Sequence, residues 1–240
     1  MNDLDVRRAP LPRDLPRWSW LFVPLVFPIF QQLFAFFDAK HYLIWMEGEE
    51  GFVEQASWIF AFAAAAVGTS LLRQRRRLPS RWLAVWLLFG TLACVYVGGE
   101  EVDWGQDWFH WKTPEEWAKI NKQHETNLHN TSSWFNQKPE LVLQVGIFVG
   151  GLVYPLTVGR RRRRQGIESV NDWRFWLWPT AIVVPTAIIS LAITLLNINH
   201  RIYYFGPTFN MTRWSETAEL YYYYFMLLYM LSFRHRLKQC

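Results

Sequence analysis

Four carboxylates and three indoles gather in residues 95–111, VYVGGEEVDWGQDWFHW, where an apolar segment becomes acidic within a few residues. A carboxylate in a partly apolar site has a raised pKa, which brings it closer to what a general base needs at neutral pH. We therefore interpret Glu100 and Glu101 as candidate catalytic groups that activate water. Trp104, Trp108 and Trp111 follow at spacings of four and three residues, which predicts one face of an interfacial helix.

The next segment carries a helix-start pattern and a polar stripe. Thr113, Pro114 and Glu116 form a capping box with proline at the first helical position, which predicts a helix over 114–129. On that helix Asn121, Glu125 and His129 would share one face. Glu125 and His129 could then bind one divalent metal ion (zinc, iron or manganese) or polarise a substrate.

Further acids lie near the ends of apolar segments. Glu54 falls about one turn inside the second predicted membrane span and Glu219 lies at the start of the sixth. An ionisable residue inside a span marks a functional site by default. Acids at helix starts also complement the helix dipole, which is the structural alternative. The candidate site has three parts, of which the first is the catalytic pair Glu100 and Glu101. The metal- or substrate-binding residues are Glu125, His129, Asn121, Glu54 and Glu219. The supporting residues are Trp104, Gln106, Gln123, Asn127 and Asn130.

The elements that must position these residues are membrane helices. The chain has 240 residues, of which 51% are hydrophobic, and its 15 Trp suit a membrane interface. The mean hydropathy of -0.03 conceals long apolar blocks between charged loops. The two cysteines, Cys94 and Cys240, give no disulfide framework. A helix needs about 20 apolar residues to cross a bilayer, and six segments qualify: 18–37, 52–72, 82–97, 141–158, 173–197 and 219–233.

The loop charges predict one orientation and one organisation. All but seven of the 25 Lys and Arg residues fall on one side of this arrangement, and the positive-inside rule puts that side, with both termini, in the cytoplasm. All but five of the 20 acids fall on or near the other side. We expect an all-α, multi-pass bundle in a bacterial cytoplasmic membrane. It would consist of a cytoplasmic tail (1–17), a six-span domain (18–233) and a second cytoplasmic tail (234–240), with residues 98–140 as the outer loop of the six-span domain. The arginine run 160–164 is read as a lipid anchor rather than a nucleic-acid site.

The motif GEEVDWGQ, followed by TPEEW and ETNLHN, resembles a family of uncharacterised bacterial polytopic membrane proteins. Their pattern is E-E-x-x-W-G-Q, then T-P, then N-x-Q-x-E-x-N-L-H-N, with an earlier E-x-G-x-x-E that Glu49, Gly51 and Glu54 match. The resemblance covers most of the chain and implies a topology and site positions but no activity. The matching positions are Glu100, Glu101, Trp104, Gly105, Gln106, Pro114, Asn121, Gln123, Glu125, Asn127, His129 and Asn130. Asp103 stands where the family has Ser, so no catalytic role is given to it.

A second likeness is to the CAAX-type intramembrane glutamate proteases, which carry E-E-x-x-x-R and F-x-x-x-H. Here Gly105 stands at the Arg position and Glu125 at the Phe position, so the likeness bears on chemistry alone.

Three functions follow from these patterns. The first is a glutamate-type or metal-dependent hydrolase acting on lipid or another membrane-embedded substrate. The second is a proton- or ion-coupled transporter, because intramembrane acids mark ion pathways and Pro179 and Pro185 could break the fifth span near its middle. The third is a non-catalytic subunit with a membrane-protein partner, since the tyrosines 221–224 and the pair Gly146 and Gly150 suit helix packing.

Overall fold

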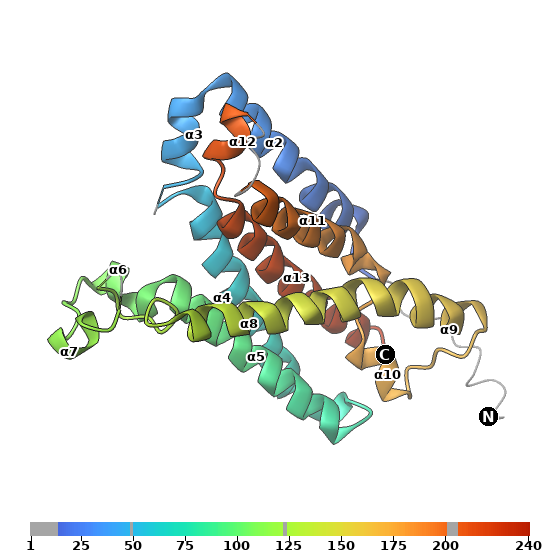
Figure 1. Ribbon diagram of the computed structural model, residues 1–240. Helices are drawn as coiled ribbons and strands as arrows, with labels where there is room; N and C mark the ends of the chain where they lie inside the picture. Colours follow the sequence, from blue (N-terminus) through green and yellow to red (C-terminus); the bar gives the residue numbers. More distant parts are fainter. Residues whose placement is uncertain (1–13, 49, 122–123, 201–205) are drawn as a thin grey trace, which may run out of the picture.

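The computed structural model describes residues 14–48, 50–121, 124–200 and 206–240. The described residues form a bundle of helices with no strand among them, which confirms the predicted all-α class (Figure 1). Its longer segments are α2 (Val23–Phe37), α4 (Phe52–Arg73), α5 (Arg81–Glu101), α8 (Ser133–Gly146), α11 (Val184–His200) and α13 (Trp214–Leu237). The shorter ones are η1 (Trp18–Phe22), α3 (Ala39–Trp45), η2 (Arg75–Arg77), η3 (Asp103–Gly105), α6 (Gln106–Phe109), α7 (Glu115–Ala118), η4 (Ile147–Val153), η5 (Pro155–Gly159), α9 (Arg160–Arg164), α10 (Trp173–Leu177), η6 (Ala181–Val183) and α12 (Pro207–Met211).

Five helical segments of the described chain are long and apolar enough to cross a membrane. They are Trp18–Phe37, Phe52–Arg73, Arg81–Glu101, Gln137–Arg164 and Trp173–Asn199. Large apolar side chains remain exposed along them, including Phe37 at 79% and Val142 at 72%, as expected of surfaces that face lipid. The chain is therefore a multi-pass integral membrane protein.

The sixth predicted span becomes α13, which is longer than the expected 219–233 and lies inside the bundle. It packs most extensively on α4 and α11. Its four consecutive tyrosines are buried, and because successive helical residues point about 100° apart, their hydroxyls reach different neighbours. Tyr221 donates to the Pro24 carbonyl at 2.6 Å, Tyr223 to Glu101 at 2.8 Å, and Tyr224 to the Ser19 carbonyl. A helix covered by its neighbours does not need the apolar composition of the other five.

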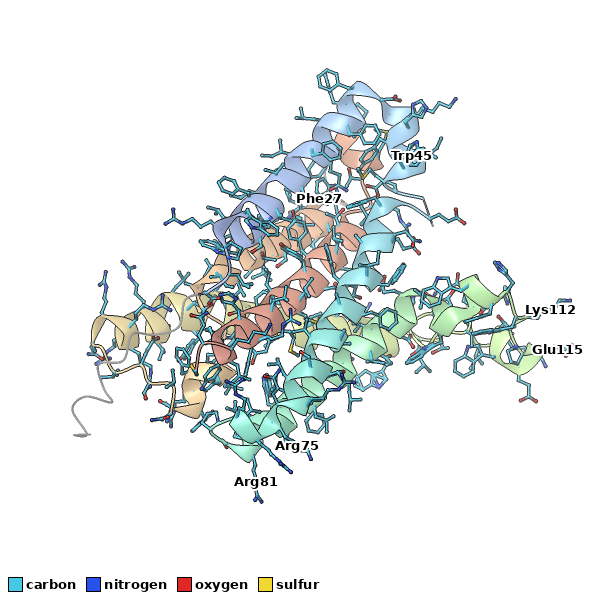
Figure 2. The ribbon with its side chains drawn as sticks, turned by 180° about the vertical axis from the view of Figure 1, so that it is seen from behind. Phe27, Trp45, Arg75, Arg81, Lys112 and Glu115 are labelled. Carbon is cyan, nitrogen blue, oxygen red and sulfur yellow. The ribbon has the colours of Figure 1, made fainter. Side chains whose placement is uncertain are left out.

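Two ends of the bundle differ in charge, and we name them by their residues. The arginine end carries Arg75–Arg77, Arg81 and Arg160–Arg164, and the acidic end carries Glu47, Glu54, Glu101 and Glu219. In Figure 2 the labelled Arg75 and Arg81 lie together, far from Trp45. The C-terminus lies near α10 in Figure 1, at the arginine end.

The fifth span is broken at Pro179, as predicted, but toward the arginine end rather than in the middle. α10 ends at Leu177, and Trp178 and Thr180 are extended, with ψ of 138° and 173°. Proline lacks the N–H that would continue the helix. Pro185 causes no break, because it lies in the first turn of α11, where a missing N–H is tolerated.

Helix packing uses a different glycine from the predicted pair. A Cβ on Gly146 would meet nothing within 4 Å, and one on Gly150 would make only ordinary contact with Pro179. Gly151 is the crowded position, where a Cβ would lie 2.7 Å from the Phe225 ring and 2.8 Å from the Ala187 Cβ. The intrachain contact is therefore one residue away from the Gly146–Gly150 motif.

Candidate functional site

The last turn of α5 carries the two glutamates, which corrects the expectation that they follow the span. Gly98 lets α5 approach α4, since a Cβ there would lie 3.2 Å from Ala61 and from the Phe62 ring. Gly99 is covered by the Trp104 indole, which a Cβ would meet at 2.8 Å. The two glycines therefore leave room for α4 on one side of α5 and for the Trp104 indole on the other.

Glu100 is buried, with 4% of its surface exposed, and holds the segment that follows α5. Its Oε2 accepts hydrogen bonds from the backbone N–H groups of Leu128 and His129, both at 2.8 Å. Its Oε1 accepts from Trp104 Nε1 at 2.7 Å, and the His129 ring lies 3.4 Å from Oε2. These donors occupy the carboxylate, so Glu100 is a positioning residue in this geometry.

We call residues 102–132 the lobe, although its residues 122–123 lie outside the described part. It projects from the bundle beyond α5 and α8 in Figure 1, and the labelled Lys112 and Glu115 mark its far side in Figure 2. Its first residues form a left-handed turn, with φ of 48° at Asp103, 57° at Trp104 and 102° at Gly105. The turn reverses the chain and lets Trp104 reach back to Glu100. The predicted single helical face for Trp104, Trp108 and Trp111 is therefore wrong, because α6 spans only Gln106–Phe109.

The predicted helix over 114–129 is also wrong. α7 ends at Ala118, and His124 has a left-handed φ of 61°. Thr113 does not cap α7, because its hydroxyl donates to the His124 carbonyl at 2.5 Å. The expected stripe of Asn121, Glu125 and His129 on one helix face does not form.

Side-chain amides fold the segment instead, as Asn side chains commonly do when they compete with helix formation. Asn121 Nδ2 donates to both oxygens of Asn127, at 3.0 Å (carbonyl) and 2.8 Å (Oδ1). Asn127 Nδ2 donates to Asp103 Oδ1 at 2.5 Å and to Glu125 Oε2 at 3.0 Å. Asn130 Nδ2 also donates to Glu125 Oε2, at 2.8 Å. Glu125 is thus held by lobe amides.

Gln106 joins the two halves of the lobe. Its Oε1 accepts from the Thr126 N–H at 2.7 Å and the Thr126 hydroxyl at 2.5 Å, and its Nε2 donates to Thr113 at 2.9 Å. The supporting residues Trp104, Gln106, Asn127 and Asn130 therefore all hold the lobe in shape. Gln123, the remaining supporting residue, lies outside the described residues.

Glu101 points into the bundle, away from the lobe amides. Its Oε1 accepts a hydrogen bond from Tyr223 Oη at 2.8 Å, and it interacts electrostatically with Glu216 and Glu219. Glu219 also interacts with Glu140 of α8. We call Glu101, Glu140, Glu216 and Glu219 the carboxylate cluster. Because like charges that interact disfavour full ionisation of the group, the cluster favours the binding of a proton.

A second polar group lies next to this cluster and contains residues that the sequence did not single out. Buried Glu47 accepts from Gln31 Nε2 at 3.1 Å, from the Tyr42 hydroxyl and from the Arg213 N–H at 2.8 Å. Arg213 also pairs with Glu216 at 2.8 Å and lies 4.0 Å from Glu54. These contacts tie α2 and α3 to the start of α13. The acidic stretch around Glu47 was the one available signal.

The depression beside Arg213 is small. It is lined by Met46, Glu47, Gly48, Val53, Glu54, Arg213 and Glu216, and holds about 150 Å³ of empty space. Small-molecule sites usually enclose about 300–1,000 Å³.

His129 is a lobe residue that interacts with Glu101 of the carboxylate cluster, and it lies outside the spans. Burial alone would lower the pKa of its imidazole, but the Glu100 carboxylate and the negative charges of Glu101 and Asp103 outweigh this and raise that pKa above its ordinary value. About a third of its side chain is exposed. His129 can therefore hold a proton beside Glu101.

The predicted metal site finds no support in these positions. Within the described ranges, no three His, Cys, Asp or Glu side chains are arranged to hold a metal ion. Glu125 is bound by Asn127 and Asn130, while His129 faces Glu100, so the two do not converge.

Fold and site together define a multi-pass helical membrane protein with a carboxylate cluster at one end of its bundle. No protein-family model, curated protein or solved structure matches the chain.

Proposed function

We propose that this protein moves protons across a bacterial cytoplasmic membrane, with Glu101 and Glu219 as the proton-binding residues. The observation that carries the proposal is the meeting of Glu101 with Glu216 and Glu219 beside the Tyr223 hydroxyl. Carboxylates in a membrane domain mark ion pathways and proton relays. In the proposed orientation the positive-inside rule puts the carboxylate cluster on the extracytoplasmic side.

Two features favour this function over hydrolysis of a lipid. Glu100 and Glu125, two residues that a hydrolase would use, are held by the lobe's own donors. The depression beside Arg213 is far smaller than a lipid chain requires.

The test is proton flux into liposomes that contain the purified protein and a trapped pH-sensitive dye. A potassium diffusion potential drives the flux, and we compare wild type with Glu101→Gln, Glu219→Gln and the lobe control Glu115→Gln. Wild type and the Glu115 variant should acidify the interior, and both cluster variants should slow this by about tenfold or more. Flux no greater than in protein-free liposomes would overturn the proposal.

A second candidate, an acid–base hydrolase, is favoured by one observation: His129 interacts with Glu101 and remains partly exposed. An imidazole and a carboxylate at an outer surface can exchange protons with a substrate and water. Incubation of the protein with membrane lipid extract, followed by mass spectrometry, tests this function. A product formed by wild type and absent with Glu101→Gln, in a protein that moves no protons, would establish it in place of transport.

A further inference from the structure

Two members of the arginine run α9 are paired with acids of the segment that follows it. Arg162 Nη2 lies 2.5 Å from an oxygen of Asp172, and Arg163 Nε lies 3.5 Å from an oxygen of Glu168. These two ion pairs hold the following segment against the end of the helix. They account for two of the five positive charges in α9.

The remaining three residues of α9 we call the open arginines: Arg160, Arg161 and Arg164. Their side chains are exposed, and none of them pairs with an acid in the part of the chain that the structure describes. They are not needed to cap the helix either, because the carbonyls of residues 161–163 accept the backbone N–H groups of residues 165–167. The open arginines are therefore available to a ligand.

The open arginines line a hollow together with Thr157 and Gln165. Residues three and four apart share one face of a helix, which explains why these five side chains meet and the two paired arginines do not join them. The hollow holds about 380 Å³, within the range of about 300–1,000 Å³ that is usual for small-ligand sites. Its lining has three guanidinium groups, a hydroxyl, an amide and no acid, so it suits an anion.

The position of the hollow along the span puts it at the membrane surface. The helical run Gln137–Arg164 has 28 residues, which at 1.5 Å each give about 42 Å, whereas the hydrocarbon core is about 30 Å thick. In Figure 1 α9 lies at the end of this run that is far from the lobe. One turn before the hollow, Val153 and Leu156 are exposed at 40% and 50%. The same helix face therefore passes from apolar side chains to guanidinium groups.

We propose that the open arginines bind the phosphate headgroup of an anionic phospholipid, whose acyl chains lie against Val153 and Leu156. The planar guanidinium group matches phosphate oxygens and binds two of them at once. A soluble anion would meet the same charges, but it would leave the apolar part of this face unused. The inference goes beyond the proposed function, and it holds whether or not the protein moves protons.

Native mass spectrometry of the purified protein in a neutral detergent, titrated with phosphatidylglycerol, tests the site by counting the lipids that stay bound. The test variant changes all three open arginines to Gln: Arg160→Gln, Arg161→Gln and Arg164→Gln. The matched control removes three exposed arginines of η2 at the same end of the bundle: Arg75→Gln, Arg76→Gln and Arg77→Gln. We expect the test variant to raise the Kd for one bound lipid by about tenfold, a change of about 1.4 kcal/mol, and the control to match wild type.

The competing ligands separate the lipid from other anions. Phosphatidylcholine, which has a phosphate but no net charge, should bind wild type more weakly than phosphatidylglycerol does, and excess inorganic phosphate should not displace the bound lipid. Displacement by inorganic phosphate would mean that the hollow takes a soluble anion, and the lipid assignment would be wrong.

The comparison of the two triple variants decides the role of the open arginines. Equal losses in both variants would show a general attraction between arginines and anionic lipid, and wild-type binding in the test variant would show that the lipid does not use the hollow; either result overturns the proposal. Elution as a single peak and an unchanged melting temperature verify that each variant is folded. If the triple test variant fails to fold, Arg161→Gln alone should weaken lipid binding relative to Arg76→Gln, and equal binding by these two variants would contradict the proposal.

Discussion

Replacing Glu100 with Gln should release the lobe while leaving the bundle intact. The carboxylate accepts three hydrogen bonds and faces the His129 ring, and each hydrogen bond to a charged acceptor contributes about 1.5–3 kcal/mol. These contributions are not additive, and breaking a buried charged pair typically costs about 3–5 kcal/mol. The neutral amide keeps one accepting oxygen but turns an NH₂ group toward donors. We therefore expect a loss near the lower value, about 3 kcal/mol.

Hydrogen exchange of lobe peptides measures this loss directly. A cost of about 3 kcal/mol raises the open population about a hundredfold, so the amides of Leu128 and His129 should exchange about that much faster. Trypsin cleavage at exposed Lys112 should rise in parallel. The matched control is Glu101→Gln, the adjacent residue of the same helix, which bonds Tyr223 rather than the lobe. Equal exchange rates in the two variants would refute the assignment of Glu100 to the lobe.

Three further predictions concern other parts of the molecule. His129 has a raised pKa in the folded lobe, so the stability that its protonated ring contributes should be complete below the pKa of an unfolded histidine and be lost as pH rises through the raised value. The rate of lobe proteolysis, measured against pH, should therefore rise over that range. His129→Gln should remove this pH dependence. Gly151→Ala should destabilise the bundle by about 1–3 kcal/mol through overpacking and lower its melting temperature in detergent, whereas Gly146→Ala should not. Tyr42→Phe removes a donor to buried Glu47 and should cost about 1–3 kcal/mol, visible as a lower melting temperature than that of a surface variant.

The spans could be read from the sequence because the bilayer imposes one requirement on every crossing helix. A run of about 20 apolar residues is needed, and the first span was predicted with the bounds the structure has, Trp18–Phe37. Helix ends were less predictable. α5 continues to Glu101 because Gly98 and Gly99 allow contacts with α4 and Trp104, and such contacts leave no mark on hydropathy.

The lobe could not be derived because long-range hydrogen bonds decide its shape. The Thr-Pro-x-Glu pattern at 113–116 is a sound helix start, yet Thr113 bonds Gln106 and His124 instead. The same residues were singled out for chemistry, and most of them hold the lobe together. Asn and Gln side chains give no indication in sequence of which backbone they will bind.

The carboxylate cluster was visible in part. Glu219 was chosen because acids within spans are unusual, and Glu101 was chosen as a candidate base directly after an apolar span. Tyr223 was missed as a site residue because a run of tyrosines indicates helix packing. Glu140 was missed because the contact between α8 and α13 is tertiary and leaves no pattern in the sequence. Glu100 and Glu101 were expected to act together, but Glu100 binds the lobe and Glu101 binds Tyr223 inside the bundle.

That division has a mechanical consequence. Successive residues of a helix point about 100° apart, so a single turn of α5 gives one carboxylate to the lobe and the next to the interior of the bundle. The peptide between them is rigid, and neither side chain can rotate about the helix axis without turning the other. Force applied to the lobe from outside would therefore be transmitted as torque on Glu101 and its bond to Tyr223.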